Sequence, residues 1–127
     1  MKLAKPLSFL PLREPTFYIL LSLALTDKHG YAIVKEVASL SEGSVQLSTG
    51  TLYEALSRLL DQGLIERVEM LAGNGPASTG PGKPRKTYRL TRIGRQVIEA
   101  EAARLSVQAA AARRQLRESW TGNTPSR

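Results

Sequence analysis

Residues 48–70 read STGTLYEALSRLLDQGLIERVEM, and after a stretch rich in Gly and Pro the chain continues with KPRKTYRL over 83–90. The first block predicts an amphipathic helix over about 49–62, because the leucines at 52, 56, 59 and 60 fall on one helical face. Ser48 suits the N-cap position of this helix. Gly63 suits the left-handed residue that follows a helix end.

Two strands are predicted after this helix, over 64–70 and 86–90. The segment between them, 71–85, is too rich in Gly and Pro for regular structure and is expected to form a long hairpin tip. A short helix beside a basic hairpin is the arrangement with which a winged-helix protein holds duplex DNA. The sequence therefore predicts a mainly α fold with a small antiparallel β-hairpin, a winged helix-turn-helix.

The rest of the chain is long enough for one domain and one further helix. Inside the domain, a buried helix over 16–25, a turn over 26–30 and a second helix over 31–40 are expected to precede the recognition helix. Four parts result: an N-terminal arm (1–14), a winged helix-turn-helix domain (15–90, wing loop 71–85), a dimerisation helix capped by Thr91 (91–119) and a flexible tail (120–127).

The last helix carries an apolar stripe with the 4-3-4-3-4 spacing of a coiled-coil seam. Its members are Ile98, Ala102, Leu105, Ala109, Ala112 and Leu116. Such a seam needs a second helix, and every other helix of the chain already has a place in the domain. We therefore expect a homodimer, the alternative being that the stripe folds back on its own domain.

Positive charge is concentrated near the predicted hairpin. The chain has a net charge of +7, and no acidic residue occurs between Glu69 and Glu99. The basic residues of this window are Lys83, Arg85, Lys86, Arg89, Arg92 and Arg95. A patch of one sign on a protruding hairpin attracts a polyanion, which favours nucleic acid over a merely solvated surface.

Several classes of function are excluded by composition. The chain has no cysteine and one histidine, so neither thiol catalysis nor a multi-histidine metal site can form within it. His29 lies in a predicted turn, where seating the following helix is a better explanation than catalysis. The longest apolar run, 17–25, is too short to span a bilayer. We expect a cytoplasmic protein that is not an enzyme and has no cofactor, no metal and no membrane contact.

The exposed face of the 49–62 helix is the candidate DNA surface. Small hydroxyl side chains and a glycine near its N-terminus allow close approach to a groove or a phosphate. The residues away from the leucine stripe are Thr49, Gly50, Tyr53, Glu54, Ser57 and Arg58. Tyr53 has two interpretations, a phosphate contact and an aromatic at the edge of the core, and the sequence does not separate them.

Four blocks together resemble the PadR family of bacterial transcriptional regulators. They are ILLSLAL (19–25), HGYAI (29–33), STGTLYEALSRLLDQGLI (48–65) and RKTYRLTRIGRQVI (85–98). The resemblance covers about residues 15–118, and the single last helix is similar to the shorter PadR subfamily. The wing departs from the family pattern, since it is longer and richer in Gly and Pro.

The resemblance implies a homodimeric winged helix-turn-helix repressor that binds double-stranded DNA at a pseudo-palindromic operator. By position, it assigns Ser48, Thr49, Gly50, Thr51 and Tyr53 to the DNA surface and Lys83, Arg85 and Lys86 to the wing. Short members of the family often sense a small aromatic effector, on which Trp120 could stack; an anchor on the partner subunit is the other interpretation of Trp120. The alternative function is a winged-helix module that binds RNA or an acidic protein.

Overall fold

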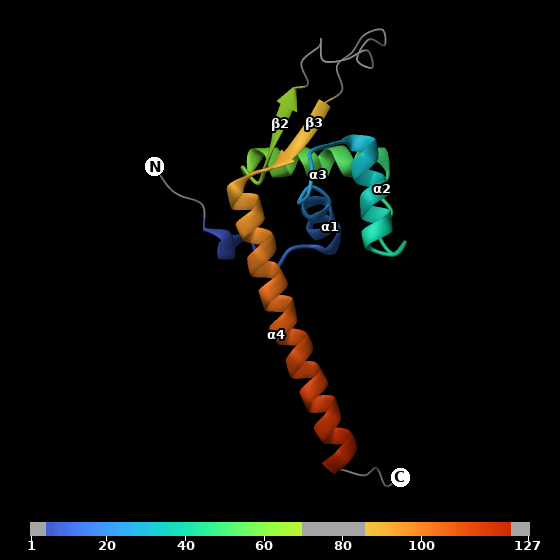
Figure 1. The fold of residues 1–127 in the computed structure, drawn as a ribbon, viewed down its shortest axis with the longest axis vertical. Coiled ribbons are helices and arrows are strands. Elements are labelled where there is room, and N and C mark those ends of the chain that lie inside the picture. Colours follow the sequence, from blue (N-terminus) through green and yellow to red (C-terminus); the bar gives the residue numbers. More distant parts are fainter. Residues whose placement is uncertain (1–4, 70–85, 123–127) are drawn as a thin grey trace.

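The computed structural model describes residues 5–69 and 86–122, so the predicted wing loop, with Lys83 and Arg85, lies outside the described residues. Three helices and a small sheet form the body, and the last helix runs away from it (Figure 1). The elements are η1 (Pro6–Phe9), α1 (Glu14–Ser22), β1 (Lys28–His29), α2 (Gly30–Leu40), α3 (Thr49–Asp61), β2 (Ile65–Glu69), β3 (Lys86–Leu90) and α4 (Arg92–Gly122).

The leucine stripe of α3 faces the core, as predicted. Leu52, Leu56 and Leu59 are buried, and Leu60 is half-buried against the same cluster. They pack with buried aliphatic side chains of α1, α2, the sheet and the first turns of α4. The polar edge of α3 is thereby held outward.

Helix α3 begins and ends at the predicted signals. The Ser48 hydroxyl accepts a hydrogen bond from the Thr51 backbone N–H at 3.1 Å, which caps the helix. Gly63 has a φ of +77°, the left-handed conformation that a side chain disfavours. These two local signals fix where α3 starts and stops.

Helix α1 ends at Ser22, three residues before the predicted Leu25. The carbonyl groups at its end accept hydrogen bonds from side chains elsewhere: Lys28 Nζ bonds the Ser22 carbonyl at 2.7 Å, and Arg95 Nη2 bonds the Ala24 carbonyl at 2.9 Å. The last carbonyl groups of a helix have no hydrogen-bond partner within it and need such partners elsewhere. The apolar run continues past Ser22, but these partners stabilise a turn.

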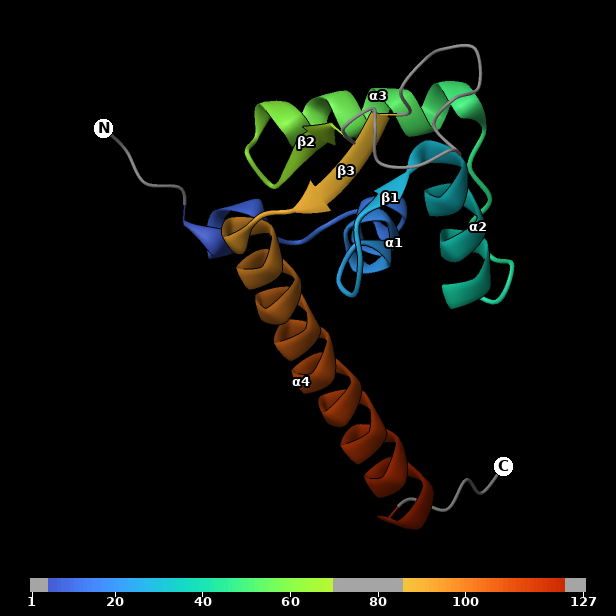
Figure 2. The ribbon, with the colours of Figure 1, turned by 45° about the horizontal axis from the view of Figure 1, so that its top comes forward.

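The hairpin gains a third strand, which corrects the predicted turn at 26–30. β1 pairs antiparallel with β3, with Lys28 opposite Tyr88 and His29 opposite Thr87. The sheet order is β1-β3-β2, so β3 is the central strand (Figure 2). A two-residue strand is too short to show alternation, so its sequence carried no strand signal.

The junction between the sheet and α4 is a single residue, Thr91. Its hydroxyl donates to the Gly63 carbonyl at 2.8 Å and accepts the Gly94 N–H at 3.0 Å, while its backbone N–H donates to the Leu64 carbonyl. Thr91 therefore caps α4, as predicted, and also bonds the end of α3. The helix continues to Gly122, so residues 120–122 are helical rather than part of the predicted tail.

The N-terminal segment packs against α4. The predicted N-terminal arm contains a short 3-10 helix, η1, and Phe9, Leu10 and Leu12 pack against the core. The Leu12 backbone N–H donates to Glu101 Oε2 at 3.1 Å, and Arg104 donates to both oxygens of the same carboxylate.

We expect this carboxylate to give the protein an acid-sensitive share of its stability. The hydrogen bonds from Arg104 hold the pKa of Glu101 below its ordinary value. A carboxylate with a lowered pKa stabilises the fold fully above about pH 4.5, its ordinary value, and ceases to do so as the pH falls through the lowered pKa. Urea unfolding of wild type and Glu101→Gln should therefore differ most at neutral pH and converge in acid. A difference that does not change with pH would contradict this.

Candidate nucleic-acid interface

The N-terminal turn of α3 presents small polar groups to solvent. Ser48, Thr49, Gly50 and Thr51 are all exposed. The Ser48 hydroxyl also lies 3.0 Å from the Thr51 hydroxyl, so the two side chains order one another. The first-turn N–H groups and the positive end of the helix dipole favour an anion at this end.

Gly50 has no packing role within the described chain. A Cβ added there would meet no atom within 4 Å. Glycine is a poor helix former compared with alanine, so the residue weakens α3 without creating room for a neighbour in the same molecule. The open backbone at Gly50 is instead available for close approach from outside.

A cavity of about 480 Å³ lies beside this turn, where four elements meet. It is lined by His29, Gly30, Tyr31, Tyr53 and Lys86, which come from β1, the start of α2, α3 and the start of β3. Tyr31 and Tyr53 are largely exposed there, and Lys35 Nζ sits 5.4 Å from the centre of the Tyr31 ring. The side chains of Tyr31, Tyr53 and Lys86 thus bring two hydroxyl groups and an ammonium group to one cavity.

Tyr53 fits both of its sequence interpretations. Its hydroxyl lies so close to α2 that a Cβ at Gly30 would come within 2.5 Å of it, so the ring packs over the first turn of that helix. The same side chain keeps much of its surface exposed. Tyr31 was not among the predicted site residues; its signal was a large aromatic on the polar side of the second helix.

Arg58 lies on another flank of α3. It comes five positions after Tyr53, which places it about 140° further around the helix. A second cavity, of about 320 Å³, has Arg58 and Gln62 on one side and the N-terminal segment, including Leu12 and Arg13, on the other. Ser57 is exposed between the two flanks. The structure therefore brings Tyr53 and Lys86 together but separates Arg58 from them.

Two of the predicted basic residues, Arg89 and Arg95, contact other groups of the same chain. Arg89 contacts the carboxylates of Asp27 at 3.1 Å and Glu66 at 3.7 Å, and the hydrogen bond with Asp27 raises the pKa of the guanidinium. Arg95 donates to the Ala24 carbonyl. The segment between Glu69 and Glu99 has no acidic residue of its own, but Asp27 and Glu66 thus offset the charge of Arg89 within it. Lys86 and Arg92 are exposed.

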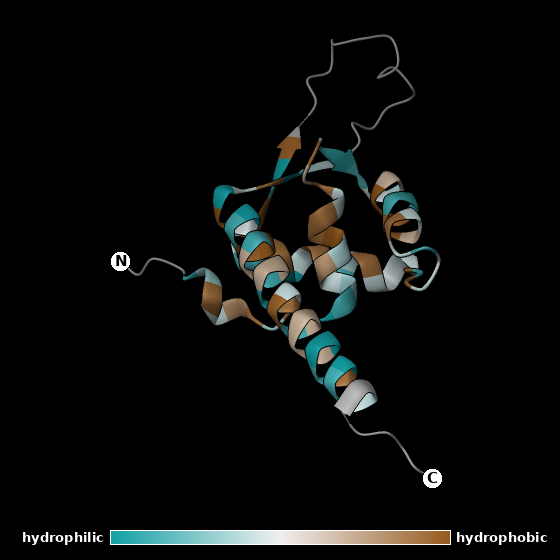
Figure 3. Cartoon of the chain, turned by 60° about the horizontal axis from the view of Figure 1, so that its bottom comes forward, coloured by the Kyte–Doolittle hydropathy of each residue, from teal (hydrophilic) through white to brown (hydrophobic). Residues whose placement is uncertain are grey.

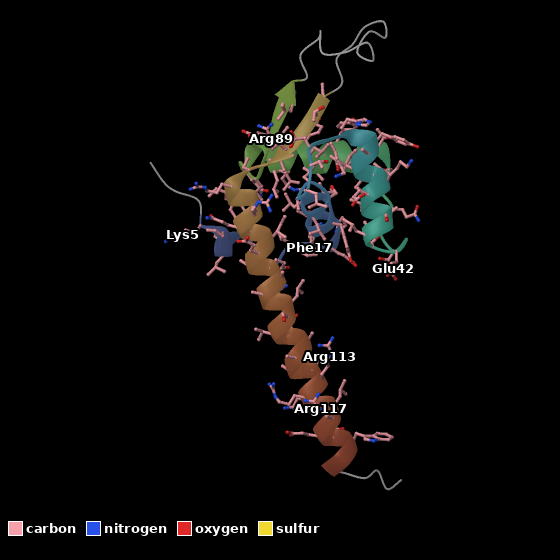
Figure 4. The ribbon with its side chains drawn as sticks, in the orientation of Figure 1. Lys5, Phe17, Glu42, Arg89, Arg113 and Arg117 are labelled. Atoms are coloured by element: carbon pink, nitrogen blue, oxygen red, sulfur yellow. The ribbon has the colours of Figure 1, made fainter. Side chains whose placement is uncertain are left out.

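The predicted seam on α4 is split between the body and solvent. Ile98 is 8% exposed and belongs to the core of its own chain, which corrects its assignment to the dimer surface. Leu105 and Leu116 are 38% and 68% exposed, and Trp120 is 76% exposed. Ala102 and Ala112 are exposed, and Ala109 is half-buried. Figure 4 shows Arg113 and Arg117 on this projecting part of α4, away from the body.

Three helices followed by a hairpin wing, with a capped polar helix end beside the wing, define a winged helix-turn-helix protein. A model of the transcriptional regulator PadR-like family matches residues 19–100, about two thirds of the chain. The chain therefore belongs to the PadR-like family of transcriptional regulators. Its single long helix after the wing is that of the short subfamily. This is a family of regulators, so the prediction that the chain is not an enzyme is confirmed.

Solved structures have the same fold. A PadR family regulator from Clostridium difficile R20291 is 27% identical, with a TM-score of 0.65 over 82% of this chain and 99% of that one. One from Eggerthella lenta is 28% identical, with a TM-score of 0.60 over 87% and 84%. Bacillus subtilis PadR, solved in complex with operator DNA, is 23% identical, with a TM-score of 0.58 over 71% of this chain and 47% of that one.

A search of curated proteins found no match. In the two described ranges, no helix combines the length and the apolar character needed to cross a membrane.

Proposed function

We propose that the chain is a sequence-specific DNA-binding repressor that binds a pseudo-palindromic operator as a homodimer. The N-terminal end of α3, with Ser48, Thr49, Gly50 and Thr51, enters the major groove. Tyr53 and Lys86 contact the flanking phosphates, together with Lys83 and Arg85 of the wing. Family membership supports this function, as does the crystallisation of Bacillus subtilis PadR with operator DNA.

The observation that carries the proposal is the bare backbone of Gly50. No neighbour among the described residues needs a glycine at this helical position, yet the position lies in the first turn of α3, at the end where helix N–H groups have no partner within the helix. A surface that accepts a groove floor requires such close approach. The adjoining cavity adds the hydroxyl group of Tyr53, about one helical turn after Gly50, and the ammonium group of Lys86.

We expect Gly50→Ala to stabilise the protein and to weaken DNA binding. Alanine in place of a helical glycine should raise the free energy of unfolding by up to about 1 kcal/mol. The added methyl group should obstruct the groove, so that the dissociation constant for the operator rises roughly tenfold, the equivalent of one disturbed base contact. Urea unfolding and fluorescence anisotropy with duplex DNA from the gene's own upstream region measure the two effects.

Ser39→Ala is the control, since Ser39 is an exposed residue of α2 outside the proposed surface. It should leave affinity unchanged. Unchanged affinity in Gly50→Ala would remove the close-approach role of this turn. Equal binding to a scrambled duplex, or preferential binding to RNA, would favour the interaction-module alternative over the operator-binding function.

Neutralising the wing should act differently from altering α3. We expect the triple change of Lys83, Arg85 and Lys86 to alanine to weaken binding to all duplexes alike. The slope of log affinity against log salt should become shallower by roughly 3, because about 0.9 counterions are released per phosphate contact. Anisotropy at a series of salt concentrations checks this. Loss of site preference with an unchanged slope would reverse the roles assigned to wing and helix.

The homodimer forms through the positions of the α4 seam that follow Ile98, which are Ala102, Leu105, Ala109, Ala112 and Leu116. Leu105 and Leu116 are exposed on this part of α4, and the spacing of the stripe is that of a seam which a second helix covers. A ligand-responsive repressor would hold a small aromatic effector near this helix pair, and Trp120 offers a stacking surface at its end. Tryptophan fluorescence of the dimer reports such binding, since Trp120 is the single tryptophan of the chain.

A further inference from the structure

Glu101 is the one charged side chain that is buried in the described parts of the chain, with 2% of its surface exposed. Its carboxylate is fully bonded. Oε2 accepts the Leu12 backbone N–H at 3.1 Å and Arg104 Nη2 at 2.9 Å, and Oε1 accepts Arg104 Nε at 2.6 Å. The hydrogen bond from Leu12 joins the N-terminal segment to α4, and the two from Arg104, which lies on α4 itself, hold the carboxylate in the orientation that accepts it.

The position of Glu101 along α4 is as informative as its contacts. It is the last buried residue of the helix: none of the residues from Ala102 to Trp120 is buried. In Figure 3 the first turns of α4 lie against the body, which carries both brown and teal segments, and the last turns of the helix extend beyond it. Glu101 thus sits where the helix leaves the body.

A buried carboxylate is a poor means of stabilisation by itself. Removing a charge from water is costly, and an apolar residue of similar size is often as stabilising as a buried ion pair. What hydrogen bonds add is direction, because they weaken steeply when their angles change. An apolar contact at the same place would constrain the angle between α4 and the body less than a hydrogen bond does.

We propose that Glu101 is a positioning residue that fixes the direction of α4 relative to α3 and thereby sets the distance between the two recognition helices of the dimer. This rests on the proposed dimer and operator. From Glu101 to Trp120 the helix extends roughly 28 Å, so a tilt of about 10° moves its end by on the order of 5 Å. One base pair is about 3.4 Å long, so such a tilt would shift the protein by more than one base pair.

The direction of α4 can be measured within one protomer. The chain has no cysteine, so Ser39→Cys on α2 and Arg114→Cys on α4, both exposed, accept one spin label each. Pulsed electron–electron double resonance gives the distance between the two spin labels. Diluting labelled protein with unlabelled protein restricts the measurement to pairs within one protomer. We expect one narrow distribution in wild type. In Glu101→Leu, which fills the same space without hydrogen bonds, the distribution should widen by on the order of 3 Å for a tilt of about 10°.

Glu99→Leu is the matched control, the same change at an exposed position two residues away, and should leave the distribution narrow. Glu101→Gln still accepts one hydrogen bond, so the width of its distance distribution should lie between those of wild type and Glu101→Leu. This variant tests the proposal if Glu101→Leu does not fold. A narrow, unshifted distribution in both Glu101 variants would overturn the proposal.

Operators of different half-site spacing give the functional readout. Wild type should prefer one spacing, and Glu101→Leu should lose that preference while binding the best site with similar affinity. A preference as sharp as that of wild type would overturn the positioning role. Because the spin-label distance needs neither DNA nor a dimer, a failure of the proposed function would appear separately, as absent operator binding in wild type itself.

Discussion

The double variant Leu105→Glu, Ala109→Glu should be a monomer that no longer recognises the operator. Both residues lie on the part of α4 that extends beyond the body, and a helix partner there would bury them. Four carboxylates would enter the seam of a dimer, each without a counter-charge, which outweighs the gain from packing leucine and alanine. Sedimentation velocity should show half the wild-type mass.

A monomer contacts one half-site, so operator affinity should fall toward nonspecific binding, by about a thousandfold or more. Val107→Glu, Ala110→Glu is the matched control, since it adds the same charge to exposed positions of α4 outside the seam. It should remain dimeric. A dimer that survives the seam substitutions, or dissociates equally in the control, would show that another surface joins the subunits.

Among the described glycines, Gly94 should tolerate an added methyl group least. A Cβ at Gly94 would overlap the backbone carbonyl oxygen of Leu64 and come within 2.8 Å of Leu90 Cδ1. The Leu64 carbonyl cannot move aside without losing its hydrogen bond from the Thr91 N–H. Overpacking against backbone should lower the free energy of unfolding by about 3 kcal/mol, despite the better helix propensity of alanine.

Urea unfolding checks this, with Gly50→Ala as the control. Both glycines are in the first turn of a helix, but only Gly94 has a neighbour in the way. The two variants should therefore change stability in opposite directions. If Gly94→Ala were as stable as wild type, α4 would not press against the turn after α3 as closely as described.

Local signals in the sequence were sufficient to predict the elements that carry the proposed DNA surface. Ser48, Gly63 and Thr91 mark helix ends through bonds to residues a few positions away, and the leucine stripe of α3 repeats within a single helix. Each of these interactions depends on neighbours in the chain. The recognition helix was consequently predicted within one residue at each end.

The features that sequence reasoning missed depend on residues far apart. Arg89 meets Asp27 across 62 positions, and Leu12 meets Glu101 across 89. The pairing of β1 with β3 likewise joins two residues to a strand almost sixty positions later. No periodicity carries such information, because the fold has to form before these groups become neighbours. The cavity containing Tyr31, Tyr53 and Lys86 was unforeseen for the same reason.

The one-residue junction at Thr91 has a mechanical consequence. β3 is held on both sides by strands, and α4 starts immediately after it, so there is no slack between the returning strand of the wing and the long helix. A torque on the far end of α4 is therefore carried into the sheet instead of being absorbed by a linker. The hairpin and α4 should therefore move together as one rigid unit, joined at Thr91.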